Sequence, residues 1–194
     1  DISEPVSQAT LRIVKVFWSL DSNLAYARHF PAINWLNSYS LYENRLQQWY
    51  IDNISPDFPK LRASAISLLQ QESELNEIVQ LVGVDALSPQ DRLILEEARM
   101  LREDFLQQDA MSDTDAYCPS EKQFQLLKLI LSYYDMGRDA LSRGANMNAL
   151  FSIPARDNIG RAKNEQDYQK AFAQIASDMH AQIAELIAKG GEQL

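Results

Sequence analysis

The sequence is poor in residues that interrupt or crosslink regular structure. Its 194 residues include 6 glycines, 7 prolines and 1 cysteine. Because glycine and proline weaken helices and strands, their scarcity favours long regular elements with little loop. Cys118 has no second cysteine to pair with, which excludes an internal disulfide and fits a reducing, cytoplasmic setting.

Positive charge and long apolar runs are also scarce. The chain has 18 Lys and Arg residues against 27 Asp and Glu residues, a formal net charge of −9. A nucleic-acid-binding surface is disfavoured, because neutralising phosphates requires clustered Lys and Arg. No apolar run approaches the roughly 20 residues that cross a bilayer, and no basic-then-apolar signal segment opens the chain. The first residue is Asp1 and not Met, so we expect a fragment of a longer protein.

Groups that could form a catalytic or metal site are sparse as well. His29 and His180 are far apart, and neither has a cysteine or histidine at metal-ligand spacing. We expect His180 at the surface and Cys118 as a packed small residue. The carboxylate pairs at 96–97 and 103–104 are expected on a solvated helix face. No Gly-x-x-x-x-Gly-Lys-Ser/Thr phosphate loop occurs, so we predict no catalytic residue and no metal site within this chain.

Two amphipathic helices with a tight turn between them are the clearest pattern. Gly83 suits the C-terminal cap of the first helix. Ser88 can cap the second helix, Pro89 is tolerated at its first position, and Asp91 adds negative charge to its first turn. We therefore predict an antiparallel helical hairpin that ends near Gln108. Its apolar positions recur at helical spacing: Leu75, Ile78, Val79 and Val82, then Ile94, Ala98, Leu101 and Phe105.

The remaining segments divide into a short α/β part and a helical part. Residues 10–20 have the β-branched and aromatic density of a strand. Residues 21–28 have room for a short helix, and 29–33 should be extended, since a residue before proline avoids the helical region. A polar loop is expected over 109–119 and a frayed tail at the end, GGEQL. Further helices are predicted at 39–53, from the turn at 55–59 into the hairpin, at 120–143, and at 165–189. The predicted fold class is mainly α, a C-terminal helical bundle preceded by a strand-helix-strand remnant of an α/β domain.

This chain resembles the catalytic A subunit of vacuolar-type and archaeal-type rotary ATPases in several long stretches, which occur in the same order. They are QATLRIVKVFWSLDSNLAYARHFPAINWLNSYSLY, VQLVGVDALSPQDRLILEEA, REDFLQQDAMSDTDAYCP and KQFQLLKLILSYYD. The resemblance covers nearly the whole chain; about the last 45 residues lack a distinctive motif. The turn of the hairpin also resembles the beta subunit of F-type ATP synthases, which has Asp-Glu-Leu-Ser-Glu-Glu-Asp there.

The resemblance implies an architecture and a cofactor. Residues 1–35 would be the C-terminal edge of the nucleotide-binding α/β domain, and 36–194 the C-terminal helical bundle domain. The phosphate loop, the catalytic glutamate and the magnesium ligand of the family would lie upstream. The full subunit would therefore hydrolyse or synthesise ATP with bound ATP or ADP and Mg²⁺, coupled to proton or sodium translocation. The fragment alone is expected to be inactive, with no nucleotide bound.

The resemblance also implies two sets of functional residues. Phe30, Met111 and Tyr117 stand where the family packs the adenine ring, and Met111 replaces an aromatic residue of some relatives. An apolar slot with offset stacking contributes about 0.5 to 1.5 kcal/mol beyond area burial. The second set, the tip segment, stands where the family contacts its rotor. It comprises Asp85, Ala86, Leu87, Ser88, Pro89, Gln90 and Asp91.

The implied partners are a non-catalytic B subunit in an alternating hexamer and the central stalk rotor subunits. Nucleic acid is not an implied partner, and the membrane is reached only through the assembled complex, with the chain cytoplasmic and peripheral to it. Because the tip segment has fewer acidic residues than the F-type motif, we expect a steric rather than an ionic rotor contact. If the resemblance misleads, the chain is a free-standing helical interaction module without nucleotide binding. We also expect the first 30 or so residues to be mobile, rearranged or paired with another copy, because an unpaired strand edge invites pairing.

Overall fold

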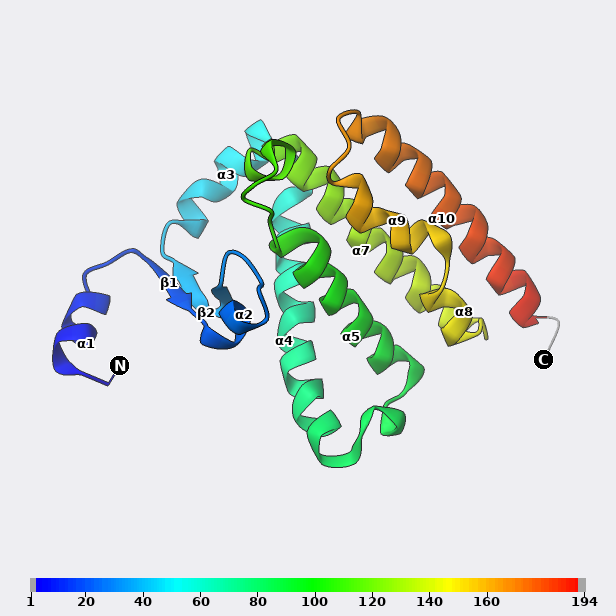
Figure 1. The fold of residues 1–194 in the computed structure, drawn as a ribbon, viewed down its shortest axis with the longest axis horizontal. Coiled ribbons are helices and arrows are strands. Elements are labelled where there is room, and N and C mark those ends of the chain that lie inside the picture. The colour runs from blue at the N-terminus through cyan, green and yellow to red at the C-terminus, as the bar shows by residue number, and fades with distance from the viewer. Residues whose placement is uncertain (1–2, 192–194) are drawn as a thin grey trace.

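The computed structural model describes residues 3–191, which form a helical bundle with a two-stranded sheet on its N-terminal side (Figure 1). The fold is mainly α, as the sequence predicts. The N-terminus and the C-terminus lie at opposite ends of the molecule (Figure 1).

The N-terminal part contains helix α1 (Pro5–Leu11), strand β1 (Val16–Leu20), helix α2 (Ser22–Tyr26) and strand β2 (Ile33–Ser40). The strands pair antiparallel, with Leu20 opposite Ile33 and an irregularity between Phe17 and Ser19. The predicted strand at 10–20 is thus wrong over its first part. Helix α1 extends through Thr10, whose hydroxyl donates to the Val6 carbonyl one helical turn earlier (2.9 Å).

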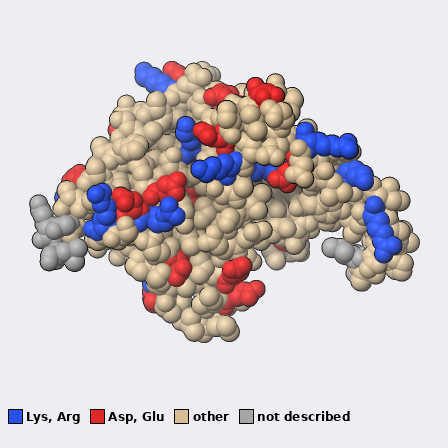
Figure 2. Space-filling model, turned by 180° about the vertical axis from the view of Figure 1, so that it is seen from behind, with Lys and Arg blue, Asp and Glu red and all other residues tan. Residues whose placement is uncertain are grey.

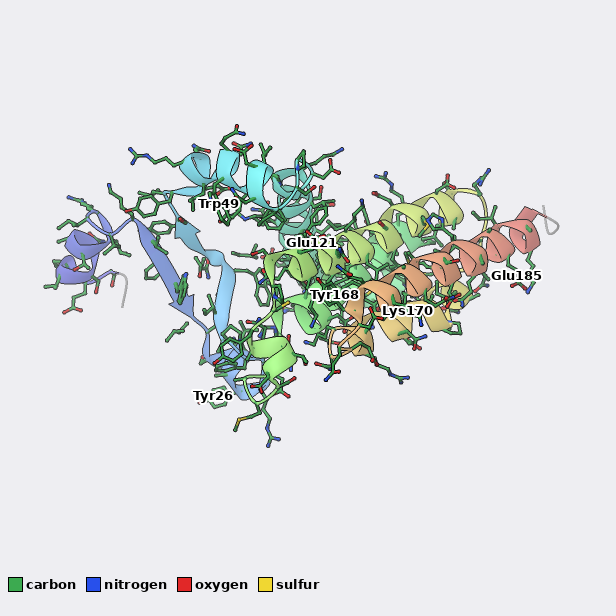
Figure 3. All side chains as sticks on the ribbon, turned by 90° about the horizontal axis from the view of Figure 1, so that it is seen from above. Tyr26, Trp49, Glu121, Tyr168, Lys170 and Glu185 are labelled. Atoms are coloured by element: carbon green, nitrogen blue, oxygen red, sulfur yellow. The ribbon has the colours of Figure 1, made fainter. Side chains whose placement is uncertain are left out.

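Apolar side chains of this N-terminal part are largely exposed. Trp18, Leu20 and Tyr26 are 68%, 80% and 86% exposed. Tyr26 and Trp49 lie on the N-terminal side of the bundle in Figure 3. Strand β1 has a partner in β2, yet its apolar face is covered only in part. The mobility or copy-to-copy pairing predicted for the first 30 residues stays a prediction.

Helix α3 (Glu43–Asn53) and helix α4 (Phe58–Val82) lead from the sheet into the bundle. Strand β2 runs across the predicted domain boundary at residue 35, and the helix predicted from residue 39 begins only at Glu43. That boundary stays a prediction. The first half of α4 buries Ala65, Leu68 and Leu69, which recur at helical spacing on one face.

The predicted helical hairpin is confirmed. A short 3₁₀ turn (Val84–Ala86) joins α4 to α5 (Pro89–Met100). Gly83 has φ +85°, a conformation that glycine adopts at little cost. The Ser88 side chain accepts a hydrogen bond from the Asp91 N–H (3.1 Å), the N-cap predicted from the sequence. After α5 the chain continues as a π-helical turn (Leu101–Leu106), so the hairpin ends at Leu106 and not at Gln108.

The last part of the bundle contains α6 (Asp113–Ala116), α7 (Ser120–Ser142), α8 (Met147–Phe151), α9 (Pro154–Ala162) and α10 (Tyr168–Gly191). Helix α7 packs on α5 and α10, and α10 also packs on α9. The predicted tail is corrected in part, because α10 includes Gly190 and Gly191, while Glu192, Gln193 and Leu194 lie outside the described residues. The side chains with almost no exposure form the centre of the core: Tyr133, Leu93, Met100, Leu101, Leu127, Ile130, Leu150, Ile159, Met179 and Glu97.

Charged side chains of both signs are interspersed on the face in Figure 2 and form no field of one sign. The projecting end of the α4–α5 hairpin shows acidic side chains and hardly any basic ones in this view. Within residues 3–191, none of the helices is both long and apolar enough to cross a membrane.

Candidate functional site

Phe30 lies beside a hollow between the N-terminal part and the bundle. The hollow, called here the Phe30 hollow, has a volume of about 500 Å³. Ligand pockets in proteins commonly fall in the range of about 300 to 1,000 Å³. The Gln108 N–H donates a 2.7 Å hydrogen bond to the Phe30 carbonyl, which joins segments far apart in the sequence. The hollow is lined by Arg28, Phe30, Glu103, Gln107, Gln108, Asp109, Ala110, Met111 and Lys163.

The structure brings two of the three predicted adenine-pocket residues to this hollow. Phe30 and Met111 line it and are 57% and 94% exposed. Tyr117, 81% exposed, follows α6 and is not among the described residues that line the hollow. The assignment of these residues to an adenine pocket stays a prediction.

His29 anchors the segment that carries Phe30. Its ring is buried, and Nε2 donates to the Arg102 carbonyl in the π-helical turn (3.0 Å). The ring also packs at a tilt against Trp35, with centroids 5.6 Å apart. The sequence carries no signal for this role, because a single histidine before Phe-Pro produces no periodic pattern. His29 thus fixes the chain on one side of the hollow.

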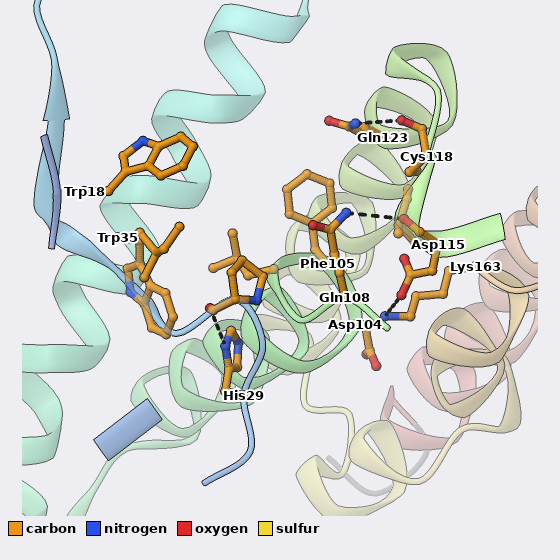
Figure 4. A pocket seen from close by; sticks show the side chains of 14 residues that line it. Trp18, His29, Trp35, Asp104, Phe105, Gln108, Asp115, Cys118, Gln123 and Lys163 are labelled. Carbon is orange, nitrogen blue, oxygen red and sulfur yellow. Dashed lines mark hydrogen bonds and ion pairs between the residues drawn. The ribbon is translucent and has the colours of Figure 1, made fainter. Parts of the chain in front are cut away.

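A second cavity, of about 360 Å³, adjoins the hollow and lies between the sheet and the bundle (Figure 4). Gln108 and Lys163 line both spaces, and Trp18 and Trp35 form part of the second cavity's apolar wall. Asp104 also lines it. Burial raises the pKa of Asp104 to about 6, although Arg99 and Lys163 favour its charged form.

The carboxylates at 96–97 and 103–104 do not share one solvated face, which corrects the sequence prediction. Glu97 is fully buried, and neither of its side-chain oxygens has a hydrogen-bond partner within residues 3–191. Burial raises its pKa well above the ordinary value, and the charges of Asp135 and Asp104 raise it further. A signal for this was present, because Glu97 follows Ile94 by three residues and precedes Leu101 by four, on the apolar stripe of α5.

The other carboxylates of this group are paired or partly exposed. Glu96 accepts from Arg99 (2.8 Å) and also pairs with Arg156. Glu103 is half exposed and pairs with Arg99 (2.7 Å). These ion pairs connect α5 and the π-helical turn with α9, so the carboxylates contribute to packing between elements.

His180 and Cys118 are the remaining single residues with a predicted position. His180 is exposed, as predicted. Cys118 is half-buried, and burial raises the pKa of its thiol. In the part of the chain that the structure describes, no group of three His, Cys, Asp or Glu side chains is arranged to hold a metal ion.

The tip segment uses its charged groups within the hairpin. Asp85 pairs with Arg92 (2.8 Å), and Asp91 accepts from the Ser88 hydroxyl (2.7 Å). The Asp85 side chain is nevertheless 97% exposed. The apolar side chains that remain open lie mostly just before the segment. Ile78, Leu81, Val82 and Val84 are 46%, 85%, 62% and 46% exposed. The predicted apolar face of the first hairpin helix is therefore open to solvent at its C-terminal end.

Comparison with known proteins identifies the family. The family described as the C-terminal domain of V and A type ATP synthase matches residues 47–150. The chain belongs to this family. The nucleotide-binding domain of the ATP synthase alpha/beta family matches residues 1–40. The two matched segments therefore follow each other along the chain, with the nucleotide-binding match first.

Relatives of the family are similar over nearly the whole chain. The V-type ATP synthase alpha chain of Acetivibrio thermocellus is 54% identical over 191 residues, which are 97% of this chain and 32% of that protein. An A-type ATP synthase chain of Pyrococcus horikoshii is 50% identical over 191 residues, which are 98% of this chain and 20% of that protein. The chain thus spans a third or less of the length of these curated relatives.

A solved structure has a similar fold. The ATP synthase subunit NeqB of Nanoarchaeum equitans superposes with a TM-score of 0.58 at 26% identity, covering 69% of this chain and 31% of that one. The fold of this chain is therefore similar to that of an ATP synthase subunit over 69% of its length.

Proposed function

We propose that this chain is the C-terminal part of the catalytic subunit of a V/A-type rotary ATPase, in which it supplies part of the adenine pocket and the contact with the rotor. The observation that carries the proposal is the meeting of Phe30 and Met111 at one hollow. These residues are distant in sequence and come from the segments that match two different domains of the family. The alternative function, a free-standing interaction module, does not predict that Phe30 and Met111 line the same hollow.

The Phe30 hollow suits the base of a nucleotide. An exposed aromatic face can stack on a purine ring, and the Met111 thioether can pack against the opposite face through its polarizable sulfur. Residues 107–110 also line the hollow. The phosphates and Mg²⁺ would be held by residues of the longer subunit, so the share of this chain is recognition of the base.

The rotor contact is assigned to the hairpin end. Its acidic residues are engaged in the Asp85–Arg92 pair and the Ser88–Asp91 cap. Its open apolar side chains are those of Leu81, Val82 and Val84, and the paired Asp85 side chain is also exposed. The proposed contact with the central stalk is mainly apolar and steric, and it includes the end of α4 as well as residues 85–91. The partners are the B subunit, which alternates with this subunit in a hexamer, and the stalk, which places the chain at the cytoplasmic head, peripheral to the membrane.

Substitution of Phe30 in the full-length subunit of the assembled ATPase tests the adenine assignment. Phe30→Ala should raise the KM for ATP about three- to tenfold with kcat retained, because one stacking wall is lost. Tyr26→Ala is the matched control, since Tyr26 is an exposed aromatic residue that does not line the hollow. An equal KM for the two variants would remove the assignment. Absence of a Gly-x-x-x-x-Gly-Lys-Thr segment upstream in the native gene product would remove the ATPase assignment altogether.

A further inference from the structure

Lys163 lies at a position that the family matches do not include. It follows α9, beyond residues 47–150, and its side chain is 13% exposed. Its ammonium group donates to the Gln107 carbonyl (2.8 Å) and pairs with the Asp115 carboxylate (3.3 Å). A long cation this deeply placed is held by specific partners, because burying a charge without them is costly.

The partners of Lys163 control the backbone beside Phe30. The buried Asp115 carboxylate accepts from the Asp109 N–H (2.7 Å), while Gln108, between Gln107 and Asp109, donates to Phe30. Residues 107–109 are therefore fixed by Lys163 and Asp115 on one side and by Phe30 on the other. The Asp109 side chain accepts a hydrogen bond from the Met111 N–H (2.9 Å). This bond also fixes the position of the Met111 backbone.

Lys163 is also the cation that balances the negative charge of the Asp115 carboxylate. Asp115 is 5% exposed, and its remaining contacts come from neighbouring backbone. Lys122, buried nearby, donates to the Thr114 carbonyl and not to Asp115. Loss of the Lys163 ammonium group would leave a buried carboxylate without its ion-pair partner, and water would enter to solvate it. The backbone at 107–109 would then lose its anchor on the bundle side.

We infer that Lys163 is a positioning residue for the purine base, which sets the distance across the Phe30 hollow by holding the 107–111 backbone. This inference rests on the proposed function of the hollow. It concerns the spacing of Phe30 and Met111, and it assigns to the α9–α10 region a part in nucleotide recognition. The side chain acts through the loop, so its removal loosens base binding without removing any group from the chemistry.

Substitution in the full-length subunit of the assembled ATPase tests this role. Lys163→Met should raise the KM for ATP about three- to tenfold with kcat retained, since the effect equals the loss of one base contact. Lys163→Arg should recover much of the difference, because the guanidinium group retains the charge and can reach both partners. Lys170→Met is the matched control, since Lys170 is exposed on α10 (Figure 3).

A second variant and a second readout protect the test against simple misfolding. Asp115→Asn removes the ion pair with almost no change of volume and should raise the KM in the same direction. The preference for ATP over GTP should fall in both variants, because a wider slot discriminates less between purines. A purely structural role would lower thermal stability or yield and leave the KM and the purine preference of the assembled enzyme unchanged.

The outcomes separate this inference from the proposed function. If Phe30→Ala raises the KM and Lys163→Met and Asp115→Asn do not, the positioning role is overturned and the adenine assignment stands. If Phe30→Ala leaves the KM unchanged, the adenine assignment fails, and the positioning role fails with it. A raised KM in all three variants, with rescue by Lys163→Arg, supports both.

Discussion

The Asp104 carboxyl group is placed where its charge is disfavoured. Burial is the largest cause of its raised pKa of about 6, against an ordinary value of 3.8, and Glu103 and Asp157 add like charge. Gly160 on α9 makes the close packing possible, because a Cβ atom there would lie 2.2 Å from Asp104 Oδ1. Glycine at this position thus allows α9 to approach the π-helical turn.

The raised pKa predicts a pH dependence of stability. Because the pKa of Asp104 is higher in the folded chain than in the unfolded chain, its stabilising contribution is present below pH about 4 and is lost as the pH rises through about 6. Asp104→Asn keeps the volume and removes the charge. It should raise the free energy of unfolding by about 1 to 3 kcal/mol at pH 8 and change it little at pH 4.

Urea unfolding of this chain at the two pH values measures the difference. Asp113→Asn, an exposed carboxylate at the start of α6, makes the same charge change and serves as the control. A gain for Asp104→Asn that is equal at both pH values would show that the burial of its charge is not the cause.

Residues differ in how well the sequence predicts their place. Phe30 and Met111 are identified through a family resemblance, and the structure sets both on one hollow. The charge of Glu97 indicates a solvated position, but its spacing from Ile94 and Leu101 puts it on the buried stripe, and the spacing proves the better guide. Lys163 and His29 have no signal, since their partners, Gln107 and Arg102, offer backbone carbonyls that any residue carries.

The π-helical turn at Leu101–Leu106 is the element that joins the hairpin to the hollow. The Gln107 N–H reaches back to the Arg102 carbonyl (2.8 Å), and His29 donates to the same oxygen. A wider turn exposes carbonyl groups that a regular α-helix would use internally, and such turns occur often at functional sites. Periodicity predicts one continuous helix, because Ala98, Leu101 and Phe105 are spaced in the sequence as on a regular α-helix.

Arg102 and Glu72 form a buried ion pair between this turn and α4. The two groups are 2.9 Å apart, and the Glu72 side chain is 8% exposed. Burial raises the pKa of Glu72 in spite of the attraction of Arg102. Arg102→Met should lower the free energy of unfolding by about 3 kcal/mol, because it leaves a buried carboxylate without its partner.

Combining Glu72→Leu with Arg102→Met should recover most of this loss, because two apolar groups replace the pair. Arg62→Met removes the partner of Glu43 in a more exposed pair and should cost less than about 1 kcal/mol. Urea unfolding compares these variants. A double variant as unstable as Arg102→Met would mean that the loss comes from the packing of the arginine side chain and not from the unpaired charge.

At the scale of the whole molecule, α5 connects two distant places. The hairpin end projects away from the rest of the bundle (Figure 1). The Phe30 hollow is lined by Glu103 and residues 107–111, which follow the other end of α5. The bundle packs α5 against α4 and α7 along this length. Because packed helices move as rigid bodies rather than bend, we expect a shift of the 107–111 segment to move the tip as well.

The proposed rotor contact predicts a loss of coupling. In the full-length subunit of the assembled ATPase, Leu81→Ser with Val82→Ser should lower the number of ions transported per ATP hydrolysed, while ATP hydrolysis itself is retained. The physical reason is the removal of the apolar surface that would press on the stalk. Gln80→Ser, an exposed polar position on the same helix, is the control. Transport per ATP equal to the control would exclude an apolar contact at this end of α4.

The sequence by itself determined the elements whose signal is local. Helix α10, the capped turn at Gly83 and Ser88, and the mainly α class follow from periodicity and capping chemistry, which act within a few residues of the chain. Tertiary structure alone decided which charges are buried, where α5 becomes π-helical, and that Lys163 holds the loop opposite Phe30. These features depend on contacts between segments far apart in sequence, and their energies come from burial and pairing that no local pattern encodes.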